Sequence, residues 1–242
     1  CSPIDGRTLM TTNYAKSSLA PPIWVLAIAV SAANVGISLL SPAIPQLRDD
    51  LMVTSDEAQL VLSAFLIMLG VGQLIAGSLS DRIGRRPVLV YGSLLFLLSG
   101  LGALFSTSIE MLVAMRIFQG LGAATCMAMG RVIISDSFQR AEAGRQMSTI
   151  TMFQSVVPLL GFAFGGVMAD LVGWRGSVGL MVVTAAMVFL GTSLLLAESR
   201  DPSIKPVPAS RIIVVYGQLL VTPLFITNAT MAATVTAVFF SM

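Results

Sequence analysis

Histidine is absent from the 242 residues, and cysteine occurs only twice, as Cys1 and Cys126. Without histidine, histidine-based acid/base catalysis is excluded. Two cysteines far apart, one of them inside an apolar run, supply neither a zinc site nor a disulfide framework. We therefore predict no metal site and expect no cofactor.

Charged residues are also scarce, at 11% of the chain, whereas a soluble domain carries about 25%. Hydrophobic residues make up 55%, which disfavours a soluble fold. The net charge of +2 is too small for a nucleic-acid-binding face, so no nucleic-acid partner is expected. The charges cluster and leave uncharged runs at residues 17–47, 58–80, 87–109, 117–130, 146–169, 176–197 and 212–242.

Most of these runs are long enough to cross a bilayer, which takes roughly 20 apolar residues in a helix. The fourth run is short only because Arg116 interrupts it, and Met111 to Ser135 otherwise reads as one helix. The sequence therefore predicts an all-α membrane protein with at least six spans in the lipid bilayer.

The connections between the runs alternate in charge. Residues 1–21, 81–86, 131–145 and 198–211 hold 11 of the 14 basic residues. The opposite connections hold Arg48 and Arg175 but six acidic residues. Because basic loops stay on the cytoplasmic side, we expect a cytoplasmic N-terminus.

The chain divides by charge and proline content into four predicted parts. Residues 1–21 read as a cytoplasmic leader, 22–197 as a six-helix bundle and 198–221 as a charged, proline-containing linker. Residues 222–242 read as the start of a seventh span that stops inside an apolar run. We therefore expect the first half of a larger protein built from two six-helix halves.

The segment GSLSDRIGRRPVL, residues 77–89, follows the second span. Glycine tolerates the positive φ of a tight turn, and proline suits the first turn of the next helix. Taken alone, the segment could be only a basic anchor that fixes topology. It also resembles the loop motif Gly-x-Leu-(Ser/Ala)-Asp-Arg-x-Gly-Arg-Arg of the major facilitator superfamily. The matching residues are Gly77, Leu79, Asp81, Arg82, Gly84, Arg85 and Arg86.

Two further segments resemble motifs of the Bcr/CflA-type drug:proton antiporters in that superfamily. The fourth span contains RIFQGLGAA, which resembles the motif Arg-x-x-Gln-Gly-x-Gly-Ala-Ala. The fifth contains PLLGFAFGG, which resembles the antiporter motif at Pro158, Gly161, Gly165 and Gly166. The resemblance implies the major facilitator fold, with its N-terminal half in this chain.

Arg116 interrupts an otherwise apolar span. A charge inside a span costs on the order of 2.5 to 3.5 kcal/mol in insertion experiments, so it normally faces a cavity or a partner. Its side chain could instead extend to the membrane interface. The resemblance favours the cavity and implies that Arg116, with Gln119 one turn along, acts in substrate binding and proton movement. Asn34 is a further candidate there, although an interhelical hydrogen bond is its more common role.

The resemblance also implies a gate at the loop motif. Arg85 is expected to pair with Asp136 at the end of the fourth span, and Asp81 is expected to cap a helix of the second half. An exposed pair contributes only about 0 to 1 kcal/mol, but making and breaking it would bias alternating access.

Two positions depart from the drug-antiporter pattern. An acidic residue usually lies about four positions before a proline in the first span, and Ser38 stands there instead. No carboxylate lies inside the first six spans, so this part offers no residue for the usual proton coupling. In the fifth span, Phe162 replaces the proline of the Gly-Pro pair and Pro158 lies upstream, which predicts a kink one turn earlier.

We expect a transporter that exports a small, amphipathic drug by proton antiport and alternating access. A carrier for a metabolite or sugar without proton coupling in this half stays open, as does a fragment that does not transport. An enzyme is disfavoured because the short loops offer no cluster of catalytic side chains. The expected partners are the substrate, protons and the bilayer, and the expected oligomeric state is a monomer.

Overall fold

A computed structural model describes residues 21–198 together with residues 227 and 230. The contacts within the chain divide it into two units, Cys1–Arg200 and Asp201–Met242. Nearly all of the predicted leader, the linker and the predicted seventh span lie outside the described residues. The fold below is that of residues 21–198.

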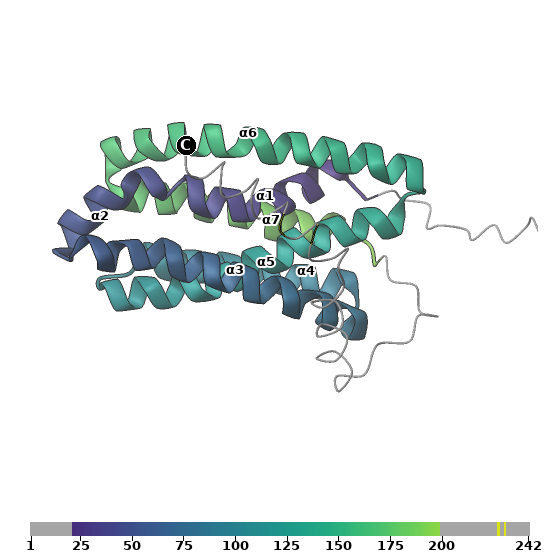
Figure 1. Ribbon diagram of the computed structural model, residues 1–242, viewed down its shortest axis with the longest axis horizontal. Helices are drawn as coiled ribbons and strands as arrows, with labels where there is room; N and C mark the ends of the chain where they lie inside the picture. Colours follow the sequence, from purple (N-terminus) through teal and green to yellow (C-terminus); the bar gives the residue numbers. More distant parts are fainter. Residues whose placement is uncertain (1–20, 199–226, 228–229, 231–242) are drawn as a thin grey trace, which may run out of the picture. The chain divides into compact units, whose positions relative to one another are not determined.

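Helices make up almost all of this part of the chain (Figure 1). Six helical segments in it are long and apolar enough to cross a membrane, and α1, η1 and α2 together form the first. The predicted all-α fold with six spans is thus confirmed over residues 21–198. The elements are α1 (Ile23–Ser38), the 3-10 turn η1 (Ser41–Ala43), α2 (Ile44–Leu51), α3 (Ser55–Ile83), α4 (Arg85–Leu104), α5 (Ile109–Ser137), α6 (Arg140–Val172) and α7 (Trp174–Leu195).

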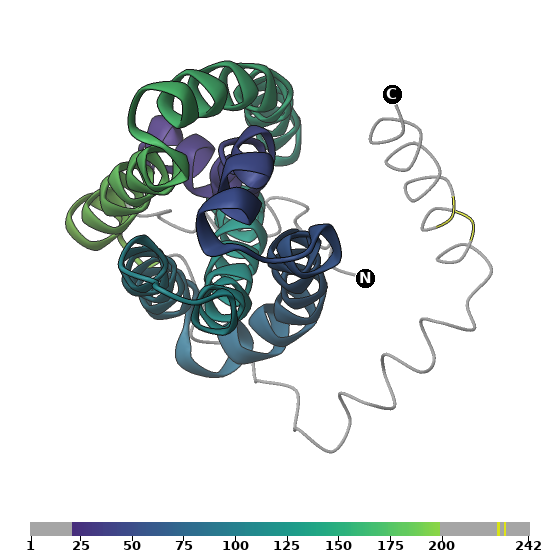
Figure 2. The same ribbon diagram turned by 90° about the vertical axis from the view of Figure 1, so that its left-hand side faces the viewer.

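The spans run side by side, as the end-on view in Figure 2 shows, and their connections lie at two opposite ends. We name these the Arg85 end and the Arg175 end. At the Arg175 end, the Arg175 guanidinium lies 2.7 Å from Asp50 Oδ2 and donates to the Ser106 carbonyl at 3.1 Å. The Trp174 indole donates to the same Asp50 oxygen at 2.8 Å. These contacts join the connections that follow α2, α4 and α6.

Side-chain caps fix where two of the long helices begin at that end. Thr54 and Glu57 form a capping box at the start of α3, in which the Thr54 backbone donates to Glu57 Oε2 at 2.8 Å. At the start of α5, Ser108 Oγ accepts from the Met111 backbone at 3.3 Å. Each cap satisfies a backbone N–H that has no partner within the helix.

The first span is interrupted between Ser38 and Ser41. Ser38 Oγ donates to the Asn34 carbonyl at 2.7 Å, and Ser41 Oγ donates to the Ile37 carbonyl at 2.8 Å. Such bonds compete with the backbone hydrogen bonds of the helix, and Pro42, the second residue of η1, has no backbone N–H to donate. The break begins at Ser38, the position at which the resemblance implies an acidic residue.

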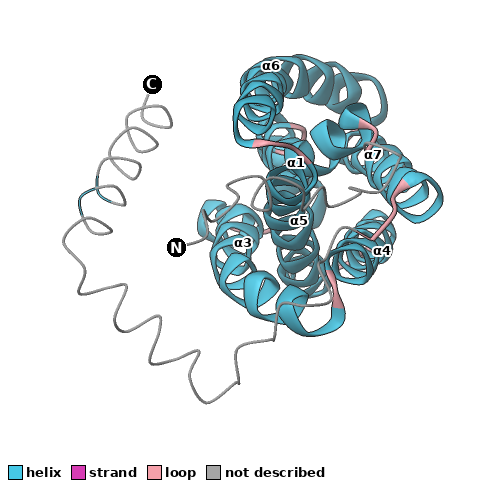
Figure 3. Cartoon of the chain, turned by 90° about the vertical axis from the view of Figure 1, so that its right-hand side faces the viewer, coloured by secondary structure: helices cyan, strands magenta, loops and turns pink. Residues whose placement is uncertain are grey.

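Helix α5 lies at the centre of the bundle and packs most extensively against α3 and α4 (Figure 3). Glycines allow this close approach. A Cβ at Gly122 would lie 2.6 Å from the Phe96 nitrogen and 2.7 Å from the Gly92 oxygen of α4. Packing of small residues brings helices together in lipid, where hydrophobicity gives no driving force between them.

Helices α3 and α6 are the least buried of the spans. Large apolar side chains are exposed along both, which suits contact with lipid or with further helices of a membrane protein. The most exposed of them are Ile67 and Leu74 on α3, and Leu159 and Leu171 on α6.

Candidate functional site

Arg116 of α5 has no solvent-exposed surface (0%). Its Nε donates to the Val61 carbonyl of α3 at 3.3 Å, and its Nη2 donates to the Gly36 carbonyl of α1 at 2.6 Å. Its Cζ lies 4.3 Å from the centroid of the Phe65 ring, a cation–π contact. The side chain is thus held between helices inside the bundle, and its role in substrate binding and proton movement stays a prediction.

Gln119, one turn along α5, accepts from Arg116 Nη1 at 2.7 Å. The same nitrogen lies 3.6 Å from Met181 Sδ of α7. Within the described residues no carboxylate forms an ion pair with Arg116, and Gln119 Nε2 has no hydrogen-bond partner. Carbonyl dipoles and an aromatic ring therefore stabilise this charge, and the cluster joins α1, α3, α5 and α7.

Ser38 is buried (2% exposed) and packs against α6 rather than facing an open cavity. A Cβ at Gly161 would collide with Ser38 Oγ, and a Cβ at Gly165 would lie 2.9 Å from Leu39 Cα. The glycines of α6 thus form a notch that receives the break in the first span. The notch holds a serine hydroxyl and leaves little room for a longer side chain at position 38.

The remaining residues of the predicted antiporter motif are less tightly packed. A Cβ at Gly166 would lie 3.9 Å from Pro42, which is an ordinary contact. Helix α6 is assigned without interruption from Arg140 to Val172, and Pro158 lies inside it. The role of this motif stays a prediction.

Asn34 contacts α6, where its Nδ2 donates to the backbone carbonyl of Gln154 at 3.0 Å. The Gln154 side chain in turn donates to the Val30 carbonyl of α1 at 3.4 Å and accepts from Arg131 Nη2 of α5 at 3.1 Å. An interhelical hydrogen bond is thus the observed role of Asn34. Gln154 was not foreseen from the sequence, because only the fold brings it beside residues 23 and 120 positions away.

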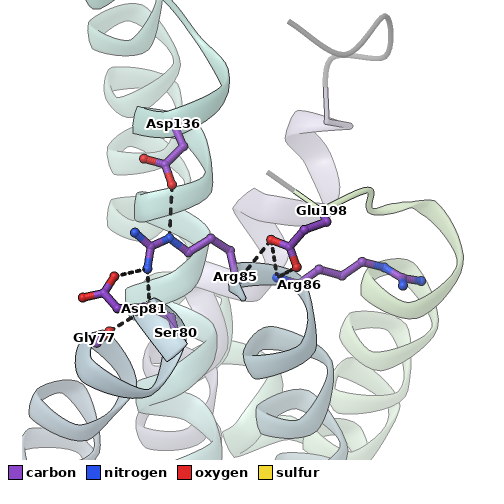
Figure 4. A network of polar contacts seen from close by, with 7 residues as sticks. All are labelled: Gly77, Ser80, Asp81, Arg85, Arg86, Asp136 and Glu198. Carbon is purple, nitrogen blue, oxygen red and sulfur yellow. Dashed lines mark hydrogen bonds and ion pairs between the residues drawn. The ribbon is translucent and has the colours of Figure 1, made fainter. Parts of the chain in front are cut away.

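At the Arg85 end, Arg85 joins two acidic residues of different helices (Figure 4). Its Nε lies 3.2 Å from Asp136 Oδ2 at the end of α5, and its Nη1 pairs with Asp81 of α3. Nη1 also donates at 2.6 Å to Ser80 Oγ, which itself donates to the Gly77 carbonyl at 2.8 Å. The Arg85–Asp136 pair implied by the resemblance is therefore present, and Asp81, expected to face a second half, contacts Arg85 here.

Glu198, just after α7, caps the start of α4 (Figure 4). Its carboxylate accepts from the Arg85 backbone N–H at 3.0 Å and from the Arg86 backbone N–H at 3.3 Å. A carboxylate at a helix N-terminus is favoured by the unsatisfied N–H groups and the helix dipole. The predicted positive φ of Gly84 is confirmed at 105°, and a Cβ there would lie 2.6 Å from Glu198 Oε2.

Arg86 also reaches α7, because its Nη2 donates to the Ser193 carbonyl at 2.8 Å. Arg82 is exposed in the last turn of α3. We call Asp81, Arg85, Arg86, Asp136 and Glu198 the Arg85 network. It ties together α3, α4, α5 and the segment after α7.

Helix α5 connects two of the groups that contain predicted site residues, the Arg116 cluster and the Arg85 network. Arg116 lies in the interior and Asp136 at the Arg85 end, 20 residues further along the same helix. At 1.5 Å per residue this separation is about 30 Å.

The sequence profile of the Major Facilitator Superfamily matches residues 26–242. The chloramphenicol resistance protein of Pseudomonas aeruginosa is 32% identical over 75% of this chain and 42% of its own length. The multidrug resistance protein D of Escherichia coli (strain K12) is 32% identical over 77% of this chain and 46% of its own length. The chain therefore spans less than half the length of these relatives.

Solved structures show the same fold. A peptide transporter POT in complex with alafosfalin has a TM-score of 0.67 at 15% identity, over 91% of this chain and 46% of its own. The proton:xylose symporter XylE has a TM-score of 0.60 at 18% identity, over 73% of this chain and 44% of its own. The profile match, the relatives and the six spans agree: the chain is a multi-pass membrane protein that belongs to the major facilitator superfamily.

Proposed function

We propose that this protein exports small amphipathic compounds, including drugs, across the bacterial inner membrane by alternating access. The relatives named for resistance to chloramphenicol and to multiple drugs support drug efflux. In the proposed orientation, the Arg85 end and the N-terminus are cytoplasmic, as the excess of basic residues in the loops at that end indicates.

The observation that carries the proposal is the Arg85 network. Its ion pairs and helix cap join three spans and the segment after the sixth at one end of the bundle. We propose that the network holds this half rigid while the substrate site, between this half and a second one, opens to either side in turn. Arg116 and Gln119 would then act as internal positioning residues behind that site.

Proton antiport is the proposed coupling, and its acidic residue would have to lie outside the first six spans. Every carboxylate among residues 21–198 lies at or beyond a helix end, and Ser38 occupies the position where the drug antiporters carry one. A carboxylate inside a span is the usual carrier of the coupled proton. This half therefore supplies structure and gating rather than the protonation site.

The notch around Ser38 favours a second candidate, a carrier for another solute that runs without proton coupling. Ser38, whose hydroxyl bonds to the Asn34 carbonyl and packs against Gly161, supplies no titratable group at this position of the first span. Such a carrier would move its substrate only down a concentration gradient.

An efflux experiment separates the two candidates. Cells producing the protein are loaded with ethidium, and its loss is followed before and after a protonophore collapses the pH gradient. We expect efflux that stops on collapse, with Arg85→Gln as an inactive control. Efflux that continues unchanged would favour the uncoupled carrier, and no efflux above cells without the protein would contradict drug export.

A further inference from the structure

Arg131 of α5 has no carboxylate partner among the described residues. Arg85 and Arg175 each form an ion pair with a carboxylate. Buried Arg116 donates to backbone carbonyls and lies over the Phe65 ring. Arg131 is exposed, and within residues 21–198 its guanidinium makes one hydrogen bond, to Gln154 Oε1 at 3.1 Å. It lies 6 residues before the end of α5, about 9 Å along the helix.

The Gln154 side chain holds this guanidinium in a fixed direction. Because the Gln154 Nε2 donates to the Val30 carbonyl at 3.4 Å, its Oε1 is the atom that faces Arg131. The Gln154 backbone is tied to Asn34 at 3.0 Å. A guanidinium has five N–H donors, so four of those of Arg131 have no partner in the described residues.

Two partly buried apolar side chains lie one helical turn from the residues of this pair. Met127 precedes Arg131 by one turn on the same face of α5, and its Sδ lies 3.6 Å from Gln73 Nε2 of α3. Val157 follows Gln154 by one turn of α6 and is half-buried. Methionine fits varied apolar shapes because its side chain is flexible and polarisable.

We propose that Arg131 binds the acidic group of an amphipathic organic anion, whose apolar body lies against Met127. The planar, doubly donating fork of a guanidinium matches a carboxylate or sulfonate. The site defines a substrate class for the export proposed above and rests on that function. It does not require proton coupling.

The test measures binding and not transport, so its result can be interpreted even if the protein does not export drugs. The purified protein, in nanodiscs of phosphatidylcholine, is titrated with 8-anilinonaphthalene-1-sulfonate and with N-phenyl-1-naphthylamine, which lacks the sulfonate. We expect Arg131→Gln to weaken sulfonate binding about tenfold or more, because hydrogen bonds to charged groups contribute about 1.5 to 3 kcal/mol. Binding of the neutral dye should change less than about twofold, a shift too small for a lost charged contact.

Matched variants separate the effect of the positive charge at position 131 from other effects of the substitution. Arg131→Lys should keep most of the sulfonate affinity, whereas Gln154→Glu should lower it by supplying a carboxylate within the protein. Arg140→Gln removes a charge at the same end and should leave both dyes unaffected. Equal losses for both dyes, no loss in Arg131→Gln, or no sulfonate binding by the unaltered protein would overturn the proposal. Complete displacement of the sulfonate by phosphatidylglycerol in the nanodisc would instead assign Arg131 to a lipid headgroup.

Discussion

At the residue scale, Arg116 shows how a membrane protein holds a charge without a counter-ion. Its forked donors reach acceptors on α1, α3 and α5 at once. Lysine would keep the charge but cannot span these acceptors, because its donors share one nitrogen. We expect Arg116→Lys to lower the free energy of unfolding by about 3 kcal/mol, the loss of one or two charged hydrogen bonds.

Denaturant titration of the purified protein measures this difference, with the exposed Arg140→Lys as the control. Arg140→Lys should be neutral. Equal stability of Arg116→Lys and the unaltered protein would show that these hydrogen bonds contribute nothing.

The notch between α1 and α6 makes a second prediction at this scale. Gly161→Ala places a Cβ against Ser38 Oγ and should destabilise the bundle by about 1 to 3 kcal/mol through overpacking. Ser38→Gly should rescue part of that loss. In a double-mutant cycle the two sites should couple by about 0.5 to 3 kcal/mol.

Gly179→Ala is the control, because a Cβ there has no atom within 4 Å outside its own helix. It should stabilise by up to about 1 kcal/mol through higher helix propensity. Additive losses at positions 38 and 161 would refute the notch.

At the element scale, the Arg85 network governs how helix ends are held together. Asp136→Arg would replace the carboxylate that now lies 3.2 Å from Arg85 Nε with a second cation. We expect ethidium efflux to fall at least about tenfold while the protein still reaches the membrane, since exposed pairs contribute only about 0 to 1 kcal/mol to stability. In the exchanged double variant Arg85→Asp/Asp136→Arg we expect efflux to be restored only in part. Asp81 contacts the side chain at position 85 and would repel an aspartate there. Unchanged efflux in Asp136→Arg would exclude this pair from the gate.

At the scale of the whole molecule, the proposed orientation can be tested by labelling. Met52, between α2 and α3 at the Arg175 end, is 92% exposed, whereas Arg140 begins α6 at the opposite end. In a Cys1→Ser background, an impermeant maleimide should label Met52→Cys but not Arg140→Cys in intact cells. Buried Cys126 should stay unlabelled. Labelling of Arg140→Cys but not of Met52→Cys would show that the Arg85 end faces outward, opposite to the proposed orientation.

The sequence predicted the six spans because a bilayer forces each into a long apolar helix, visible in charge spacing alone. It also predicted the glycine turn at position 84, since that signal is local. The helix cap by Glu198 and the bond from Arg131 to Gln154 escaped it. Glu198 is 112 positions from Arg86 in the sequence, and Gln154 is 23 positions from Arg131. Only the packing of α4, α5, α6 and α7 brings these residues together.

The central claim, that this protein moves drugs across a membrane, is tested most directly with purified protein in liposomes. Radiolabelled chloramphenicol is supplied outside, and its accumulation inside is measured under an imposed pH gradient. We predict accumulation above the external concentration that disappears in Arg116→Lys and on collapse of the gradient. Uptake no greater than in protein-free liposomes would contradict the account.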